Sequence, residues 1–166
     1  MNKVIYSIAT EQLKGTVGKE NFLMRAWAGG GRGQTGNAAD HSAASYDVFR
    51  KNQHNKGIHG GPLPPGLYLC THIAKHSHFG ECIFLQAITP FMKIDMNAQI
   101  RFCDREGFFI HGRGPHGSDG CIVPELDNER LRLNKAIKNA VGIVVLEVVN
   151  PGMPLPAAIN TRSRLA

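Results

Sequence analysis

Residues 107–124 read GFFIHGRGPHGSDGCIVP, in which an apolar run, a glycine-rich loop and a cysteine follow one another. The apolar run predicts a short strand that ends at His111. The loop leads to Cys121, and the residues after the cysteine predict the first turn of a helix. This order predicts an imidazole at the end of a strand and a thiol at the start of a helix.

Such a pair has a direct chemical use. A thiol near a helix N-terminus loses its proton more easily, because the helix dipole and free N–H groups stabilise the thiolate. A histidine within reach completes a thiolate–imidazolium pair that attacks a carbonyl carbon. The N–H groups of Gly120 and Cys121 would then hold the oxyanion. We therefore predict Cys121 as nucleophile and His111 as base; His116 is the alternative base, held less firmly by its loop.

The rest of the chain is rich in short apolar runs bounded by turn residues, a pattern typical of strands. A helix is predicted after the cysteine, because Pro124 suits a first turn and Gly142 can cap the last one. We predict a mainly β domain with one main helix over residues 1–150, followed by a C-terminal tail over residues 151–166. The predicted strands cover residues 3–9, 21–28, 67–74, 81–88, 98–103, 107–112 and 142–149.

Composition narrows the class of protein. A net charge of +6 and a pI of about 9.4 suit either nucleic acid or an anionic envelope polymer. The basic residues are scattered rather than interleaved with aromatics, which disfavours nucleic-acid binding. No run of about 18 apolar residues is present, so no membrane span is expected. The start, MNKVIYSIATEQLKG, has no apolar core of a standard signal peptide.

The cysteines form no CxxC pair, which disfavours a zinc ribbon or a thioredoxin-type site. Cys70, Cys82 and Cys103 lie in apolar runs, where a free thiol behaves as a small hydrophobe. The sequence leaves open a Cys70–Cys82 disulfide across a hairpin. Cys121 differs from the other three, because glycines and polar residues surround it.

Another histidine group, THIAKHSH, has the spacing H-x3-H-x-H at His72, His76 and His78. On a helix the first two would share a face, as zinc ligands do. The segment lies between two predicted strands, so a hairpin connection is the favoured interpretation. We predict no metal and no organic cofactor, with a His/Cys metal protein as an alternative.

Two short motifs carry a resemblance to a known family. The pieces IHG at residues 110–112 and SDGCI at residues 118–122, followed by a helix and a valine-rich strand, resemble the catalytic domain of L,D-transpeptidases (YkuD-like). In their shortened form, these two pieces more closely resemble one subgroup, the L,D-transpeptidase-like effectors of type VI secretion systems (the DUF2778 or Tlde1 type). The segment GGPLPPGLY at residues 60–68 resembles an element of the same subgroup. The resemblance covers most of residues 1–150 and implies a compact β-sandwich or β-barrel.

The resemblance also implies roles for the matching residues. Cys121 would be the acylated nucleophile, and His111 the general base and acid. The carbonyl of Gly112 would orient the imidazole, a task that an Asp or Asn side chain fills in other cysteine enzymes. Ser118 would support the loop or touch substrate.

Substrate contacts are expected around this pair. Asp119 would bind a substrate amine and Arg113 a substrate carboxylate, although a turn and a solvated loop are the alternatives for these two. His59 would line the cleft beside the proline-rich turn, and Tyr68 would contact substrate from the strand that follows it. Asp119 stands where the family usually has a second histidine, and Val123 stands where an Arg or Asn is usual.

The implied reaction is attack of the thiolate on the amide between diaminopimelate and the terminal D-Ala of a peptidoglycan tetrapeptide stem. The thioester would then react with water (an L,D-carboxypeptidase), with a free D-amino acid (exchange) or with the amine of another stem (a crosslink). The subgroup implies an antibacterial toxin, made in the cytoplasm without a standard signal peptide and acting in the periplasm of a target cell. Its partners would be a secretion apparatus and a cognate immunity protein.

Two further alternatives remain at this point. An NlpC-like cysteine endopeptidase places its cysteine before its histidine, whereas no histidine follows Cys121 here. A catalytically inactive wall-binding or adaptor module would keep the fold without the chemistry. The Asp119 and Val123 departures from the family pattern keep this second alternative open.

Overall fold

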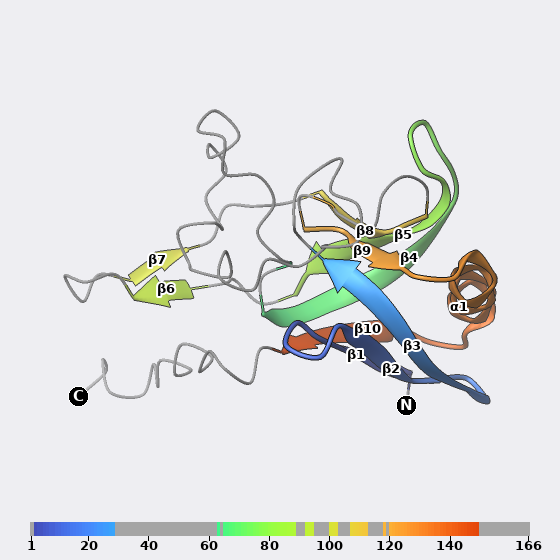
Figure 1. Cartoon of the computed structure of the whole chain (residues 1–166), viewed down its shortest axis with the longest axis horizontal. Coiled ribbons are helices and arrows are strands. Elements are labelled where there is room, and N and C mark those ends of the chain that lie inside the picture. The colour runs from blue at the N-terminus through green and yellow to red at the C-terminus, as the bar shows by residue number, and fades with distance from the viewer. Residues whose placement is uncertain are drawn as a thin grey trace.

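The strands form a closed barrel with one helix at its end (Figure 1). Neighbouring strands around the barrel follow the order β1-β10-β4-β5-β8-β9-β3-β2, and β1 pairs with β2 to close it. The barrel strands are β1 (Lys3–Ser7), β2 (Gln12–Val17), β3 (Glu20–Ala28), β4 (Gly66–His76), β5 (Gly80–Ala87), β8 (Phe108–Ile110), β9 (Ile122–Pro124) and β10 (Val144–Val149). This computed structural model describes residues 2–28, 63, 65–88, 92–94, 100–102, 107–112, 118 and 120–149.

Three elements complete the described chain. Strands β6 (Met92–Ile94) and β7 (Ile100–Phe102) pair with each other as a separate two-stranded sheet. Helix α1 (Asp127–Asn139) lies at one end of the barrel (Figure 1). The helix buries Leu133 and Ile137 in the same apolar cluster as the barrel interior, so it closes the core at that end.

Side chains alternate along each strand between the barrel interior and the outside, as the β pleat requires. In β1 the buried residues Val4 and Tyr6 alternate with partly exposed ones, and the parallel neighbour β10 buries Leu146 and Val148 in the same way. The Tyr6 hydroxyl donates to the Ala26 carbonyl at 3.2 Å, which satisfies a polar atom deep in the core. The interior is therefore a packed apolar core.

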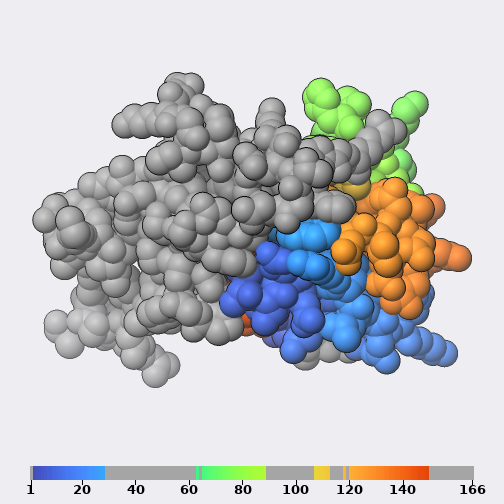
Figure 2. All heavy atoms as spheres, in the orientation of Figure 1, coloured from blue at the N-terminus to red at the C-terminus, as the bar shows by residue number. Residues whose placement is uncertain are grey.

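The β4–β5 hairpin extends beyond the barrel wall. Its strands pair in register from Tyr68 opposite Ala87 to Ile73 opposite Cys82, with an irregularity before the tip. In Figure 2 the tip of this hairpin, in green, stands above α1, in orange. The hairpin thus reaches past the edge of the sheet on the side where β8 ends.

The predicted fold class is confirmed: the protein is mainly β, with one main helix after Cys121. Each predicted run contains a strand, and β2, β6 and β9 were not predicted. Within the described residues, no helix is both long enough and apolar enough to cross a membrane. The predicted tail, residues 151–166, lies outside the described part, so the predicted domain boundary stays a prediction.

Candidate active site

Strands β8 and β9 bring His111 and Cys121 to neighbouring positions. The two strands are parallel, with Ile110 opposite Ile122, and the His111 N–H donates to the Ile122 carbonyl at 3.0 Å. His111 directly follows Ile110, and Cys121 directly precedes Ile122. Because Ile110 and Ile122 face the core, alternation places the next residue on each strand toward the outside of the barrel. His111 and Cys121 therefore lie on the same outer face of neighbouring strands, diagonally across the Ile110–Ile122 pair.

The imidazole of His111 is held by its own backbone neighbourhood. Its Nδ1 lies 2.8 Å from the carbonyl oxygen of Gly112, the contact that the family resemblance implies. A carbonyl only accepts hydrogen bonds, so the proton sits on Nδ1 and Nε2 is the acceptor nitrogen of the neutral ring. Only 7% of the His111 surface is exposed. Burial lowers the pKa of His111, the Gly112 carbonyl raises it, and the charges of Arg130 and His76 lower it.

Ser118 organises the loop that carries the cysteine. Its hydroxyl donates to the Cys121 carbonyl at 2.5 Å and accepts from the Gly120 N–H at 3.2 Å. Gly120 has φ +116°, a region that a side chain would make costly. Ser118 is itself buried, so of its two predicted roles the structure displays loop support.

The same bonds correct one prediction. The Gly120 N–H was expected to hold an oxyanion together with the Cys121 N–H. In the structure, the Gly120 N–H instead donates a hydrogen bond to the Ser118 hydroxyl within the loop. An amide carries a single hydrogen, so this donor is not directed at a substrate in the observed arrangement.

A second correction concerns the position of the thiol. Cys121 was expected at the N-terminus of a helix, but β9 and two further residues separate it from α1. Strand β9 pairs with β3, where Val123 lies opposite Trp27, so the residues after the cysteine complete the barrel instead of starting a helix. A helix dipole acts within its first turn, so it does not explain activation of this thiol.

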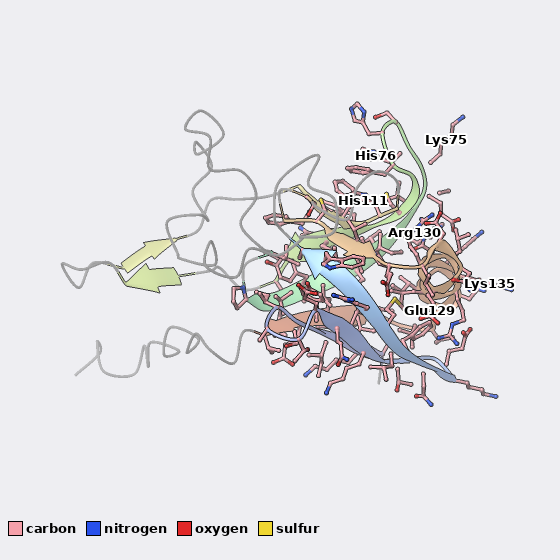
Figure 3. All side chains as sticks on the ribbon, viewed as in Figure 1. Lys75, His76, His111, Glu129, Arg130 and Lys135 are labelled. Carbon is pink, nitrogen blue, oxygen red and sulfur yellow. The ribbon has the colours of Figure 1, made fainter. Side chains whose placement is uncertain are left out.

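Helix α1 contributes Arg130, which sequence reasoning missed. Its guanidinium bonds Asp127 at 3.1 Å and the Glu81 carbonyl at 3.0 Å, and its side chain is 11% exposed. It also packs against the backbone that holds the imidazole, since a Cβ placed on Gly112 would lie 2.5 Å from the Arg130 Nε. In Figure 3, Arg130 lies between His111 and α1. No short-range motif marks this residue, because it comes from the following helix.

Gly112→Ala is therefore expected to displace Arg130 and tilt His111. We expect kcat to fall about 10- to 100-fold, because small errors in the position of a base are costly. Activity assays on Gly112→Ala, Arg130→Ala and the double variant measure the effect. Removing Arg130 relieves the closest contact but leaves the Asp127 Oδ1 at 2.8 Å from the added Cβ. If crowding is the cause, the loss in the double variant should therefore be smaller than the sum of the two single losses. Parent-like activity of Gly112→Ala would contradict this account.

An aromatic ring covers His111 from the hairpin. Phe79, in the β4–β5 turn, stacks on the imidazole with 4.0 Å between ring centroids and 12° between planes. His76, at the end of β4, stacks on the same phenyl ring at 4.9 Å and 19°. Figure 3 shows His76 near the hairpin tip and His111 below it. The predicted hairpin is present, with His72 and His76 on strand β4 and His78 in the turn, but its contact with the site was not predicted.

The structure describes only one of the other predicted substrate contacts, Tyr68. Tyr68 is fully buried and packs edge to face against Phe108, with centroids 6.3 Å apart. This corrects its predicted role, because a side chain in the core presents no surface to substrate. His59, Arg113 and Asp119 lie outside the described residues, as do the alternative base His116 and Cys103.

The remaining described thiols are buried. Cys70 lies opposite Leu85 and Cys82 lies opposite Ile73, so the register separates the two cysteines, and both are free. Burial raises the pKa of Cys70 to about 12 and also raises the pKa of Cys82. Cys121 is partly exposed. Among the described cysteines it is thus the one that a substrate could reach.

The hairpin histidines form ordinary contacts. His72 Nε2 lies 2.9 Å from the Glu81 carboxylate. The His76 Nδ1 accepts hydrogen bonds from the backbone N–H groups of His78 and Phe79. In the described part of the chain, no three His, Cys, Asp or Glu side chains gather in a way that could hold a metal ion.

Comparisons with known proteins add a distant likeness. No protein-family model matches the chain, and no curated protein sequence matches it. A solved structure with a similar arrangement is the L,D-transpeptidase (residues 123–326) from Xylanimonas cellulosilytica DSM 15894. It is 14% identical over 89% of this chain, with a TM-score of 0.40, and the alignment spans 60% of that structure. The site described above stands on the geometry of this chain's own residues.

The buried imidazole makes stability depend on pH. Because the pKa of His111 is lowered by folding, the unfolded chain binds a proton there more readily. The neutral buried imidazole therefore contributes to the free energy of unfolding. This contribution is fully present above the ordinary histidine pKa of about 6.5, and it is lost as pH falls through the lowered pKa of the folded state. Denaturant unfolding at about pH 7.5 and about pH 5.5 should show a smaller loss of stability for His111→Gln than for the parent. An equal loss of unfolding free energy in the parent and in His111→Gln would contradict the lowered pKa of His111.

Proposed function

We propose that this chain is a cysteine enzyme acting on peptidoglycan tetrapeptide stems, with Cys121 as nucleophile and His111 as base and acid. The observation that carries the proposal is the imidazole beside the cysteine strand, with Nδ1 on the Gly112 carbonyl and Nε2 left as acceptor. The IHG and SDGCI motifs that resemble L,D-transpeptidases support the substrate class.

The proposed first half-reaction uses both residues. Nε2 of His111 takes the thiol proton, and the Cys121 thiolate attacks the carbonyl carbon between diaminopimelate and the terminal D-Ala. The tetrahedral intermediate collapses, the C–N bond breaks, and the imidazolium returns the proton to the leaving amine of D-Ala. A thioester on Cys121 remains. Burial favours the neutral imidazole, which is the form that can accept the thiol proton.

The second half-reaction decides the product. Water, deprotonated by His111, would release a tripeptide stem and make the enzyme an L,D-carboxypeptidase. The amine of a free D-amino acid would instead give exchange. We propose these two outcomes over crosslinking, because the resemblance to the effector subgroup at residues 60–68, 110–112 and 118–122 favours them.

Oxyanion stabilisation is proposed for the Cys121 N–H. The Gly120 N–H is engaged by Ser118, so this role differs from the two-donor arrangement expected from sequence. The two Ser118 bonds hold the peptides on either side of the Gly120–Cys121 peptide, which carries the Cys121 N–H, and so restrain that donor from both sides. A fixed backbone donor is useful to an oxyanion, since it need not reorganise during reaction.

The biological setting is proposed from the subgroup resemblance. The chain would be an antibacterial effector of type VI secretion, acting in a target periplasm and neutralised by an immunity protein in the producing cell. A net charge of +6 suits an anionic wall.

Mass spectrometry of tetrapeptide muropeptides, with and without added D-Met, tests the activity. The parent should remove one D-Ala or replace it with D-Met, and Cys121→Ala should do neither. Intact stems with both proteins under reducing conditions would overturn the proposal and favour an inactive wall-binding module.

A further inference from the structure

The wall of the barrel beside the site carries an aromatic cluster, formed by His76, Phe79, Phe84, Phe109 and His111. Phe109 of β8 contacts the Phe79 ring at 5.3 Å and the His76 ring at 4.9 Å between centroids. Phe84 of β5 contacts Phe109 at 5.4 Å. The rings of His76 and Phe79 therefore pack against Phe109 and His111, so the projecting hairpin is anchored to the barrel at this point.

The turn that presents Phe79 is itself fixed. The His76 Nδ1 accepts from the His78 N–H at 3.1 Å and from the Phe79 N–H at 3.3 Å. These two bonds clamp the turn residues onto the His76 ring. Because Phe79 stacks on that same ring, its backbone and its side chain are both tied to His76.

The imidazole needs such a support. The Gly112 carbonyl fixes one nitrogen of His111, but a histidine ring rotates in a broad χ2 well and can pivot about a single hydrogen bond. A ring stacked at 4.0 Å and nearly parallel restricts that pivot and shields one face from water. The stack therefore supplies a constraint that the backbone contact lacks.

We propose that Phe79 is a positioning residue, which holds the plane of the His111 ring so that Nε2 is directed at the Cys121 thiol. The proposal rests on the proposed function, in which His111 is the base. It deepens that function by assigning the β4–β5 hairpin to the active site.

Charged groups face the imidazole from several elements. Arg130 comes from α1 and is paired with Asp127, and His76 comes from β4. None of these is removed when Phe79 is changed. Burial of the ring is the leading cause of the lowered pKa of His111. Phe79→Ala also removes the ring on which His76 stacks, so a change in the His111 titration reports lost burial together with any movement of His76.

The test compares three variants. Phe79→Ala removes the stack, Phe79→Tyr keeps a ring of the same shape, and Phe84→Leu removes a ring of the cluster that contacts Phe109. We expect Phe79→Ala to lower kcat at least about tenfold with little change in KM, because the base is misaligned while the substrate surface remains. The pKa on the acid side of the kcat/KM profile should move upward. Phe79→Tyr and Phe84→Leu should resemble the parent.

A second measurement is independent of turnover. In the Cys121→Ala background, NMR titration of the His111 ring should show a higher pKa after Phe79→Ala and no change after Phe84→Leu. If the parent fails to turn over stems, the proposed function fails, and the NMR result still decides whether Phe79 controls the ring. A folded Phe79→Ala protein with the parent's kcat, pH profile and His111 titration would overturn the proposal.

Discussion

Cys121→Ala is expected to reduce stem turnover by about 1,000-fold or more, because the variant lacks the thiol that forms the proposed covalent intermediate and the other described cysteines, Cys70 and Cys82, are buried. The loss should appear in kcat with little change in binding, since the thiol occupies a small part of the substrate surface. Steady-state assays on tetrapeptide muropeptides, together with a binding measurement on the same stems, separate the two effects. Unchanged thermal unfolding would show that the substitution leaves the fold intact.

The matched control is Cys82→Ala. Cys82 lies on β5, is fully buried, and has its pKa raised by burial, so it is not expected to react with substrate. This variant should keep the parent's kcat, even if the small cavity costs some stability. Turnover that survives Cys121→Ala, or that disappears with Cys82→Ala in a folded protein, would contradict the assignment of the nucleophile.

Gly15→Ala is expected to destabilise the fold by about 3 kcal/mol or more. Gly15 of β2 lies opposite Val4 of β1, and an added Cβ would sit 2.2 Å from the Lys3 carbonyl oxygen and 2.6 Å from the Val4 Cα. These are backbone atoms of a strand that also pairs with β10, so they cannot move aside without opening the barrel. Urea unfolding followed by circular dichroism measures the change.

Gly18→Ala provides the comparison for this glycine. Gly18 also has a positive φ, +60°, but an added Cβ would meet nothing within 4 Å. Gly18→Ala should therefore lower the free energy of unfolding by only about 1 kcal/mol, which is the cost of a left-handed backbone conformation for a residue with a side chain. The difference between the two variants isolates the close approach of β1 and β2. Equal stabilities would show that the strands can separate locally.

The sequence predicted the parts of the fold that repeat locally. Alternation along β1 and β10 is a property of five or six consecutive residues, so it can be read directly. The same holds for His111 at the end of β8, because the apolar run before it defines the strand. The Gly112 contact joins adjacent residues, so the family motif alone was enough to imply it.

Contacts that depend on closure of the barrel could not be predicted in this way. Strand β9 is three residues long and ends in Pro124, so its sequence resembles a helix start; pairing with β3 makes it a strand. Phe79 and Arg130 reach His111 from a hairpin turn and a helix distant in sequence. Tyr68 looked like a site residue beside a turn, but its position in the register points it into the core.

The central claim is that Cys121 carries the substrate acyl group, and the most direct measurement is the intact mass of enzyme quenched with acid during turnover of a tetrapeptide stem. The account predicts an adduct equal to the stem fragment without its terminal D-Ala, mapped by peptide digestion to Cys121 and absent from Cys121→Ala. It also predicts that hydroxylamine removes the adduct, as expected for a thioester. Turnover without any adduct on Cys121, or an adduct mapped to another residue, would contradict it.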